Sequence, residues 1–447
     1  MATHIEYTPS SSPTGIQQTI SFWMKRSELG TDQCIFEARQ NGTNLSSVKF
    51  NTNDELQIYS ENGGTTNVYL KTSRKFRDPN GWYHIVYAID TSQGTAADRI
   101  KMYVNGVQET SFSSSTYPSQ NYDNFWYGIA QKQVIGRDNQ GGGSEDFQGI
   151  LSHFHYSRGY VYQASTFGST DSTTGEWKIN TSPSGVNYGA TGWFILKDGN
   201  SVTDQSGNSN NFTVGSGTLT KTEDCPSNVF ATWNSLNNYY SQSTFANGNT
   251  KVTMGSSQYT YNTSTLGMTS GKFYAEFKQG SGGSDSMFGI SSTEATSTSA
   301  ELGNYPNDYG YYQADGKIWS NNSYVVNPYG ATWSAGDIIG VAVDLDNNKL
   351  YFSKNGTWQN SGDPTSGSTG TGAVSITAPA STSLGVYFFG FSDYWGAGSS
   401  SCEANFGNGY FGTTAVSSAG TNASNIGIFE YDVPTGYTAL STKGLNE

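Results

Sequence analysis

The sequence predicts an all-β protein, and two observations carry this prediction. Charged residues make up only 13% of the 447 residues, whereas the chain contains 54 Gly, 30 Tyr, 23 Phe and 10 Trp. This composition is too aromatic for a disordered chain and too poor in helix-forming residues for a helical bundle. Segments in which apolar and polar residues alternate with period two recur along the chain, bounded by Gly, Asn, Asp and Ser. The length admits two to four domains, and we expect two large ones with a connector.

Charge and hydropathy exclude two classes of protein. The net charge is −13, which excludes a basic nucleic-acid-binding protein. No apolar run approaches the roughly 18–20 residues that span a bilayer, so we expect no membrane insertion. The first residues, MATHIEYTPSSS, lack the charged and then apolar pattern of a signal peptide. We therefore expect a soluble protein that does not follow the secretory route.

The first half of the chain contains a central strand and a β-hairpin. Residues 82–90, WYHIVYAID, carry apolar side chains on both faces, which is typical of a strand packed between two layers. Residues 99–104 run into Asn105-Gly106, a dipeptide that tolerates the positive φ of a two-residue hairpin turn, and 107–109 lead out. Further strands are expected at 20–25, 134–137 and 149–156.

The middle of the chain is less regular. No periodicity is present between residues 163 and 183, where Ser, Thr and Gly predominate, so a long loop or a domain boundary is expected there. Strands are expected at 192–196 and 211–214, separated by a polar turn at 204–208. The pattern leaves open whether these two strands close the first domain or open the second.

The second half repeats this organisation with different residues. Residues 271–277 alternate apolar and polar side chains, and 338–345 are apolar on both faces, as expected for a second central strand. A tight turn and residues 350–353 then lead to Asn355-Gly356. A buried strand, a polar turn and an aromatic strand ending in Asn-Gly occur in the same order in both halves, which indicates two related sandwiches in tandem.

Each half resembles a known domain family. The first half resembles a LamG-type, concanavalin-like jelly roll through motifs in the order that this family shows: ISFWMKRS (20–27), GWYHIVYAID (81–90), RIKMYVNGVQE (99–109), VIGRD (134–138) and GILSHFHYSRG (149–159). The second half resembles a SPRY domain through GKFYAEF (271–277), MFGIS (287–291), DYGYYQADGKIWSNN (308–322), AGDIIGVAVDLDNNKLYFSKNGTW (335–358) and GVYFFGF (385–391). The resemblance implies two tandem concanavalin-like jelly-roll sandwiches: LamG-like at 1–165, a connector with strands at 166–225 that could complete the first domain, and SPRY-like with a C-terminal tail at 226–447.

The pairing of these domains resembles a set of marine bacteriophage virion proteins. The stretches that carry this resemblance are 76–112, 225–238 and 431–444. It implies a structural protein on the virion surface, made in the host cytoplasm and assembled with other capsid or tail proteins; we expect a homo-oligomer. A capsid decoration and a tail fibre or receptor-binding protein both stay open. The sequence has no long repetitive shaft or coiled coil, which favours the capsid.

Motifs of the common enzyme classes are absent from the sequence. Glucanases with a jelly-roll fold carry carboxylates at alternating positions of one strand, E-x-D-x-E or E-x-D-x-x-E, and neither pattern occurs. No Gly-x-Ser-x-Gly elbow, Walker loop or H-E-x-x-H motif occurs either. We therefore expect a protein that is not an enzyme. The alternative is a polysaccharide-active glycoside hydrolase with an unrecognised carboxylate pair.

Two places could hold a metal ion, and for both a structural interpretation is favoured. Some LamG domains bind calcium at a loop rim, and the acidic turn at 204–208 could supply oxygen ligands, but an Asx-turn explains the same residues. His153 and His155 would share one face of a strand, but no third ligand is evident, and neighbouring hydroxyls explain them better. We expect no cofactor.

Aromatic residues in loops are the best candidates for ligand binding. Their rings pack against the apolar faces of sugars or of protein partners, while nearby Asn, Asp and Ser form hydrogen bonds to hydroxyls. The competing interpretation is packing in the core or against another subunit. SPRY domains generally bind partners through loops at one end of the sandwich, which favours the Tyr-Trp pair of SDYWGAG; the expected ligand is a host-cell surface polysaccharide. The candidates are Tyr394, Trp395, Tyr305, Tyr309 and the pair Tyr239-Tyr240.

Overall fold

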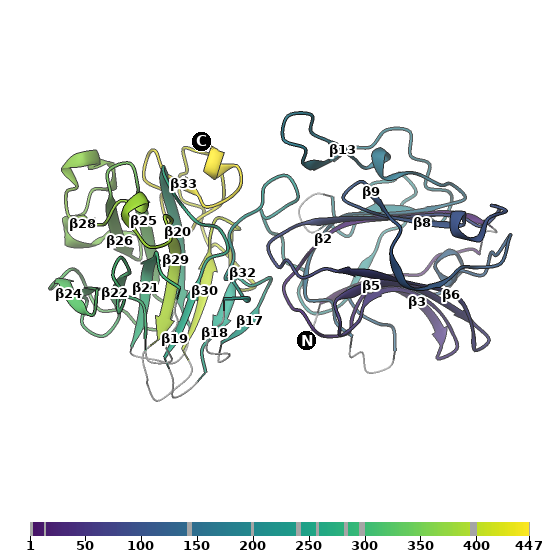
Figure 1. Cartoon of the computed structure of the whole chain (residues 1–447), viewed down its shortest axis with the longest axis horizontal. Coiled ribbons are helices and arrows are strands. Elements are labelled where there is room, and N and C mark those ends of the chain that lie inside the picture. The colour runs from purple at the N-terminus through teal and green to yellow at the C-terminus, as the bar shows by residue number, and fades with distance from the viewer. Residues whose placement is uncertain are drawn as a thin grey trace. The chain divides into compact units, whose positions relative to one another are not determined.

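The chain forms two compact units, residues 1–221 and 222–447, each of which is a β-sandwich (Figure 1). The computed structural model describes residues 3–12, 15–140, 145–197, 201–237, 243–255, 259–280, 285–294, 300–393 and 400–446. The predicted all-β class with two tandem sandwiches is confirmed. Short 3-10 helices are present at Ala96–Asp98, Trp126–Gly128, Ala164–Thr166, Gln359–Ser361, Pro364–Thr369, Pro379–Ser381 and Gly444–Asn446. In the described part of the chain, none of the helices has the length and apolar character needed to cross a membrane.

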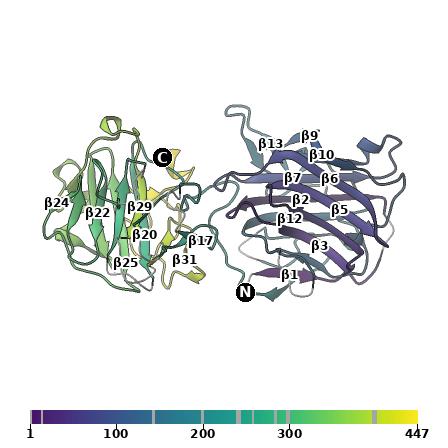
Figure 2. The same ribbon diagram turned by 60° about the horizontal axis from the view of Figure 1, so that its bottom comes forward.

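The first unit consists of an eight-stranded and a six-stranded sheet. The larger sheet has the order β10-β6-β5-β4-β3-β11-β1-β16, and Figure 2 shows several of these strands side by side. Its strands are β1 (His4–Tyr7), β3 (Gln33–Asn41), β4 (Asn44–Phe50), β5 (Glu55–Asn62), β6 (Thr65–Lys75), β10 (Phe112–Thr116), β11 (Gln133–Ile135) and β16 (Thr213–Ser216). Because β16 pairs with β1, the strand that was expected near 211–214 closes the first sandwich.

The six-stranded sheet of the first unit has the order β15-β12-β2-β7-β8-β9. Its strands are β2 (Gln17–Arg26), β7 (Tyr83–Asp90), β8 (Ile100–Val104), β9 (Val107–Glu109), β12 (Gly149–Arg158) and β15 (Trp193–Ile195). The predicted hairpin joins β8 to β9, with Asn105 and Gly106 at φ 47° and 79°. The core lies between the two sheets, because every second residue of β7 faces the opposite sheet: Ile85, Tyr87 and Ile89 are fully buried there.

A segment that we call the strap, residues 162–188, covers the outer face of this six-stranded sheet. It contains a short hairpin of β13 (Gly168–Thr170) and β14 (Trp177–Ile179), and Figure 1 shows β13 beyond the layer that contains β2. Phe167 of the strap packs on Val86 of β7, and Trp177 Nε1 donates a hydrogen bond to His84 Nδ1 at 3.0 Å. The strap therefore explains why β7 is apolar on both faces.

The second unit consists of a nine-stranded and a six-stranded sheet. The larger sheet has the order β17-β18-β30-β20-β25-β26-β27, with β28 paired to β26 and β33 to β20. Its strands are β17 (Thr244–Ala246), β18 (Lys251–Thr253), β20 (Lys272–Gln279), β25 (Ile338–Asp344), β26 (Lys349–Lys354), β27 (Thr357–Trp358), β28 (Val374–Ser375), β30 (Ser401–Asn405) and β33 (Thr438–Ala439). The strands β31 (Tyr410–Phe411) and β32 (Thr414–Ala415) pair with each other in a separate two-stranded sheet.

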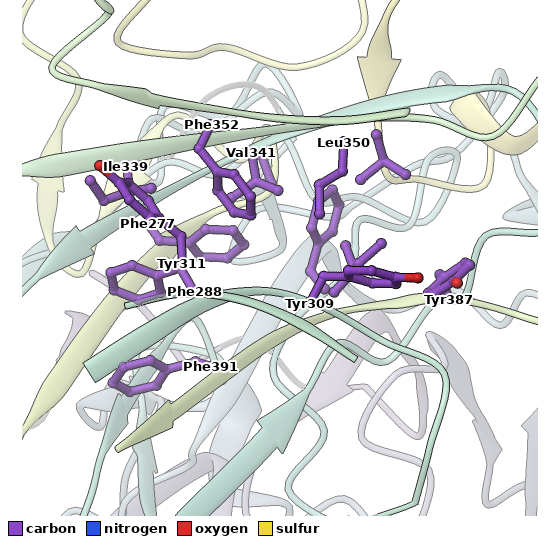
Figure 3. Packing of buried hydrophobic residues seen from close by; sticks show 14 of the residues in the cluster. Phe277, Phe288, Tyr309, Tyr311, Ile339, Val341, Leu350, Phe352, Tyr387 and Phe391 are labelled. Atoms are coloured by element: carbon purple, nitrogen blue, oxygen red, sulfur yellow. The ribbon is translucent and has the colours of Figure 1, made fainter. Parts of the chain in front are cut away.

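The six-stranded sheet of the second unit has the order β19-β29-β21-β22-β23-β24. Its strands are β19 (Thr260–Thr263), β21 (Ser286–Ser291), β22 (Tyr309–Tyr312), β23 (Ile318–Ser320), β24 (Ser323–Val326) and β29 (Phe388–Asp393). Figure 3 shows the core between the two sheets, where Val341 and Phe352 of the larger sheet face Phe288 and Tyr311 of the smaller one. All four side chains are fully buried.

The C-terminal segment, by which we mean residues 426–437, covers the outer face of the nine-stranded sheet. Ala342 of β25 packs in a second cluster with Phe429 and Tyr437. Beside them, Glu276 of β20 accepts hydrogen bonds from the backbone N–H groups of Glu430 and Tyr431, both at 2.8 Å. The C-terminal segment thus covers β25 as the strap covers β7, which accounts for the apolar character of both faces of β25.

Candidate functional site

The outer face of the six-stranded sheet in the second unit carries the candidate site. Strand alternation places Tyr309 and Tyr311 in the core, so Tyr312 points to the outer face. On β23, Ile318 is a core residue, and Trp319 therefore points outward. Trp319 pairs with Tyr324 on the edge strand β24, which places this second ring on the same face.

These three residues form what we call the aromatic surface: Tyr312, Trp319 and Tyr324. The ring centroids of Trp319 and Tyr324 lie 4.4 Å apart at an interplanar angle of 64°. Those of Tyr312 and Trp319 lie 6.2 Å apart at 88°. Both geometries are edge-to-face arrangements, which aromatic pairs favour because ring edges are positive and ring faces negative. Tyr324 is 47% exposed, so this surface is open to a ligand at its edge.

A segment formed by residues 300–308 covers the neighbouring part of the same face. Leu302 lies over Gly390 and Gly310: a Cβ atom at Gly390 would stand 3.1 Å from the Leu302 side chain, and one at Gly310 would stand 3.0 Å from its carbonyl oxygen. The glycines therefore give this segment its close approach to the sheet. The segment is anchored to the β23–β24 turn, where the backbone N–H of Asn322 donates to the carbonyl of Gly303 at 2.8 Å.

Polar groups border the aromatic surface. The Tyr312 hydroxyl donates a hydrogen bond to Asp285 Oδ1 at 2.6 Å. Lys317 lies over the ring of Tyr324, with Nζ 4.2 Å from the ring centroid, and its ammonium forms an ion pair with Asp315 at 2.7 Å. The amide side chains of Asn321 and Asn322 belong to exposed residues in the adjoining turn.

Burial and, after it, nearby carboxylates shift the pKa values of groups at this site. Burial raises the pKa of Tyr312 well above its usual value, and the hydrogen bond to Asp285 together with the charges of Asp285, Glu301 and Asp315 adds to the rise. Burial also raises the pKa of Glu301 to about 8, with a further contribution from Asp285 and Asp393. The hydrogen bond to Asp315 raises the pKa of Lys317, which keeps its ammonium charged at neutral pH.

The predicted site residues have different positions. Tyr305 is half-buried and packs against the cluster that underlies Tyr312 and Trp319, so it borders the aromatic surface. Tyr309 is 7% exposed and belongs to the core, where its ring does not face solvent. The alternation in DYGYYQADGKIWSNNSY could have identified Tyr312 and Trp319, because both occupy strand positions that alternate with core residues. The candidates outside the described residues are Tyr394, Trp395 and the pair Tyr239-Tyr240.

Among its described residues, the first unit holds no cluster of side chains that could bind a metal ion. Asp204 accepts hydrogen bonds from the N–H groups of Phe194, Ser206 and Asn210 at 2.8–2.9 Å and from the Ser206 hydroxyl at 2.7 Å. Its carboxylate is thus engaged within a turn, as the Asx-turn interpretation predicts. His155 Nδ1 lies 2.9 Å from the Tyr188 hydroxyl, and no group of three or more metal-ligating side chains was found in the described chain.

Comparisons with known families agree with this architecture. A model of the concanavalin A-like lectin/glucanases superfamily matches residues 2–161, and a model of the SPRY domain matches residues 239–379. The chain therefore contains a LamG-like, concanavalin-type domain followed by a SPRY domain. We use these names below for the two units.

Individual relatives share parts of the chain. Ran-binding protein 9 of Xenopus tropicalis is 38% identical over 87 residues, which cover 19% of this chain and 16% of that protein. The matched part is thus a small fraction of the relative's length. Among solved structures, the SPRY domain of human HERC1 is 15% identical with a TM-score of 0.28, covering 34% of this chain and 86% of that one. The heptameric SAP-like pentraxin from Limulus polyphemus is 16% identical with a TM-score of 0.30, and the match covers 49% of this chain and 91% of that one.

Proposed function

We propose that this protein is a non-enzymatic binding protein that adheres to glycans through the aromatic surface. The observation that carries the proposal is the grouping of Tyr312, Trp319 and Tyr324 on one outer sheet face beside the exposed Asn321 and Asn322. Aromatic rings pack against the apolar faces of sugars, and amide side chains both donate hydrogen bonds to hydroxyls and accept them. The match of the first domain to a lectin and glucanase superfamily supports the same class of ligand.

The proposal assigns no catalytic step to the carboxylates at this site. A glycoside hydrolase needs one carboxyl group that donates a proton and a second that acts as nucleophile or base on the opposite side of the scissile bond. Asp285 accepts a hydrogen bond from Tyr312, and Asp315 is paired with Lys317. Glu301 is only 8% exposed. These contacts suit a binding surface, and incubation with polysaccharides should release no reducing ends.

We place this binding protein on the surface of a phage particle. The support is the resemblance of the tandem LamG-like and SPRY pairing to marine bacteriophage virion proteins, carried by residues 76–112, 225–238 and 431–444. In this proposal the chain is made in the host cytoplasm, assembles as a homo-oligomer on capsid or tail proteins, and presents the aromatic surface to the host envelope. The capsid is the favoured location.

Localisation on purified particles of the encoding phage tests this placement. We expect mass spectrometry to detect the chain in those particles, and cryo-electron microscopy to show its density on the capsid. Density on the tail alone would replace the capsid decoration with a tail fibre. Absence of the chain from particles would reject a virion role, while the glycan-binding proposal would stand on its own test.

Removal of one exposed ring tests the glycan-binding proposal. Tyr324→Ala is expected to weaken the Kd for a bound polysaccharide about ten-fold, because an aromatic contact and its buried area contribute about 1.4 kcal/mol. Binding of the full-length protein is measured by biolayer interferometry on immobilised laminarin, dextran and mannan. Tyr160→Ala is the matched control, because Tyr160 is a similarly exposed tyrosine, at 40%, in the other domain.

The outcomes separate the proposal from its competitors. Equal binding by Tyr324→Ala, Trp319→Ala and the unmodified protein would show that glycans do not contact this surface. Binding that Tyr160→Ala weakens as much as Tyr324→Ala does would indicate a non-specific apolar effect. Release of reducing ends, abolished by an acidic-to-amide substitution, would favour the hydrolase alternative.

A further inference from the structure

Three aromatic side chains of the strap rest on two buried histidines of the sheet beneath it. Trp177 stacks on His84 of β7, with ring centroids 6.0 Å apart at 16°. Tyr188 stacks on His155 of β12 in the same way, at 6.1 Å and 11°. Phe167 contacts both imidazoles, at 6.4 Å and 4.8 Å. Neither histidine is more than 2% exposed, so the strap is anchored on two buried groups that can gain a charge.

The hydrogen bonds of His84 fit only a neutral ring. The indole N–H of Trp177 can only donate, so Nδ1 of His84 must accept the bond at 3.0 Å. Nε2 then carries the single proton and donates it to the Ser21 hydroxyl, 3.0 Å away. A second proton would occupy Nδ1 and point at the N–H of Trp177. Protonation of His84 therefore breaks this bond between the strap and β7.

Burial under the strap opposes a charge on both histidines. It lowers the pKa of His84 to about 3 and that of His155 well below its usual value. Trp23 of β2 also stacks on His84, at 4.7 Å, and an indole ring attracts a cation. Because Trp23 belongs to the sheet, this attraction is retained when the strap lifts and does not favour the closed state.

The charges that act on these two histidines come from histidines. His153 acts on His84, and His153 and His84 act on His155, in each case lowering the pKa. The other charged side chains on the outer face, the strap and the turn after β15 are Lys25, Lys101, Asp171, Glu176, Lys178 and Asp204. The remaining titratable neighbours are Tyr103, Tyr162 and Tyr188, which carry no charge at acidic pH. Asp171 is paired with Lys178 at 2.8 Å, and among the described residues no carboxylate raises the pKa of either histidine.

The strap is attached in a way that lets it lift while the sandwich stays folded. Its hairpin of β13 and β14 pairs only within itself and joins neither large sheet. Its two ends are fastened together, because the backbone N–H of Asn187 donates to the Tyr162 hydroxyl at 2.7 Å. Phe167 and Val86 belong to a cluster separate from the core between the sheets. Opening of the strap therefore leaves that core closed.

We infer that the strap is an acid-released cover of the LamG-like domain, held shut by neutral His84 and His155. As the pH falls through the range in which a solvated histidine titrates, the open state binds protons that the closed state cannot hold. Opening uncovers Trp23, Val86 and Phe194, each at most 5% exposed in the closed domain. This inference is independent of the glycan-binding proposal, which concerns the other domain.

Hydrogen–deuterium exchange of the full-length protein at pH 7 and pH 5 tests the inference, read by mass spectrometry and corrected for intrinsic exchange rates. An isolated two-stranded hairpin is barely stable in water, so the amides of β13 and β14 exchange once the strap lifts. For His84 alone, the proton balance between pH 7 and 5 raises the opening equilibrium about 25-fold. We expect strap protection factors to fall by about this factor or more. The amides of β7 should stay about 100-fold better protected than the strap at pH 5, because they exchange only when the sandwich unfolds.

Two variants test the histidine contact itself. His84→Gln does not titrate, and its side-chain oxygen can still accept a bond from Trp177, so the fall in strap protection should be about 25-fold smaller. Trp177→Phe keeps a ring on His84 and removes the N–H, so opening should increase about five-fold already at pH 7, the equivalent of one hydrogen bond. His4→Gln is the matched control, because His4 is a largely buried histidine on β1 of the other sheet, 2.9 Å from the Ser216 hydroxyl. It should leave the response of the strap unchanged.

Three outcomes would overturn the inference. Equal protection of the strap and of β7 at pH 5 would show that acid unfolds the whole domain at once. An unchanged fall in strap protection in His84→Gln, or unchanged opening in Trp177→Phe, would show that the contact between these two residues does not hold the strap. An equal loss of pH dependence in His84→Gln and His4→Gln would attribute the response to total charge.

Discussion

Phe277→Ala is expected to lower the free energy of unfolding of the SPRY domain by about 3–5 kcal/mol, the range for a fully buried ring whose removal leaves a cavity. Phe277 has no exposed surface. Its ring stacks on Phe288 of the opposite sheet, with centroids 5.5 Å apart, and contacts Trp233 at 5.5 Å and Phe406 at 5.6 Å. The ring therefore joins both sheets, and its neighbours are too large to refill the space.

Urea unfolding of the full-length protein measures this effect. The SPRY transition, followed by near-UV circular dichroism, should move to lower urea, whereas the LamG-like transition provides an internal reference. Tyr324→Ala is the surface control, because a half-exposed ring outside the core should change stability by no more than about 0.5 kcal/mol. A loss below 1 kcal/mol for Phe277→Ala would mean that the core relaxes around the missing ring.

Local sequence signals predicted the strands well and their partners less well. Asn105-Gly106 and Asn355-Gly356 form hairpin turns, because both asparagines adopt positive φ, as their dipeptides predict. The strand at 338–345 was expected to pack between two layers because both faces are apolar. One face does pack on the opposite sheet, but the C-terminal segment covers the other. Strand periodicity does not reveal such covers, since the strap and the C-terminal segment have no regular alternation.

The candidate site was predicted in its chemistry and only partly in its residues. Tyr305 borders the aromatic surface, whereas Tyr309, three residues before Tyr312, belongs to the core. Whether Tyr309 or Tyr312 points to the outer face depends on which face of β22 packs in the core. A one-residue shift in register would exchange the two faces. The pairing of Trp319 with Tyr324 depends on a bulge between Ile318 and Trp319, which the sequence pattern does not indicate.

Lowering the pH from 7 to 4 is expected to destabilise the LamG-like domain. Burial lowers the pKa of His84 to about 3, and also lowers the pKa of His155 well below its usual value. Trp177 donates a hydrogen bond to His84 Nδ1, so protonation of that nitrogen would break this bond. Between pH 6.5 and 3 the unfolded chain binds a proton at His84 that the native domain does not. The free energy of unfolding therefore decreases as the pH is lowered, and His84 accounts for a loss of about 3 kcal/mol at pH 4.

The SPRY domain is expected to respond in the opposite direction. Burial raises the pKa of Glu276 to about 7 and that of Asp308 to about 7, although hydrogen bonds from Glu430, Tyr431 and Tyr261 act against the rise. These groups bind protons more tightly in the native domain than in the unfolded chain. Their contribution is complete below the unfolded pKa of about 4 and is lost as the pH rises through 7. For Glu276 the difference between pH 4 and 7 is about 3 kcal/mol.

Calorimetry of the full-length protein at pH 4, 5.5 and 7 separates these effects, because the two domains give opposite shifts. His84→Gln should flatten the pH dependence of the LamG-like transition alone, and Asp308→Asn that of the SPRY transition alone, since neither replacement titrates. Shifts of both transitions in one direction would show that other groups dominate the proton balance. Opposite shifts that each variant reduces in its own domain would tie the strap to neutral His84. They would also tie the SPRY core to its protonated acids, because each substitution leaves the other domain's titrating groups in place.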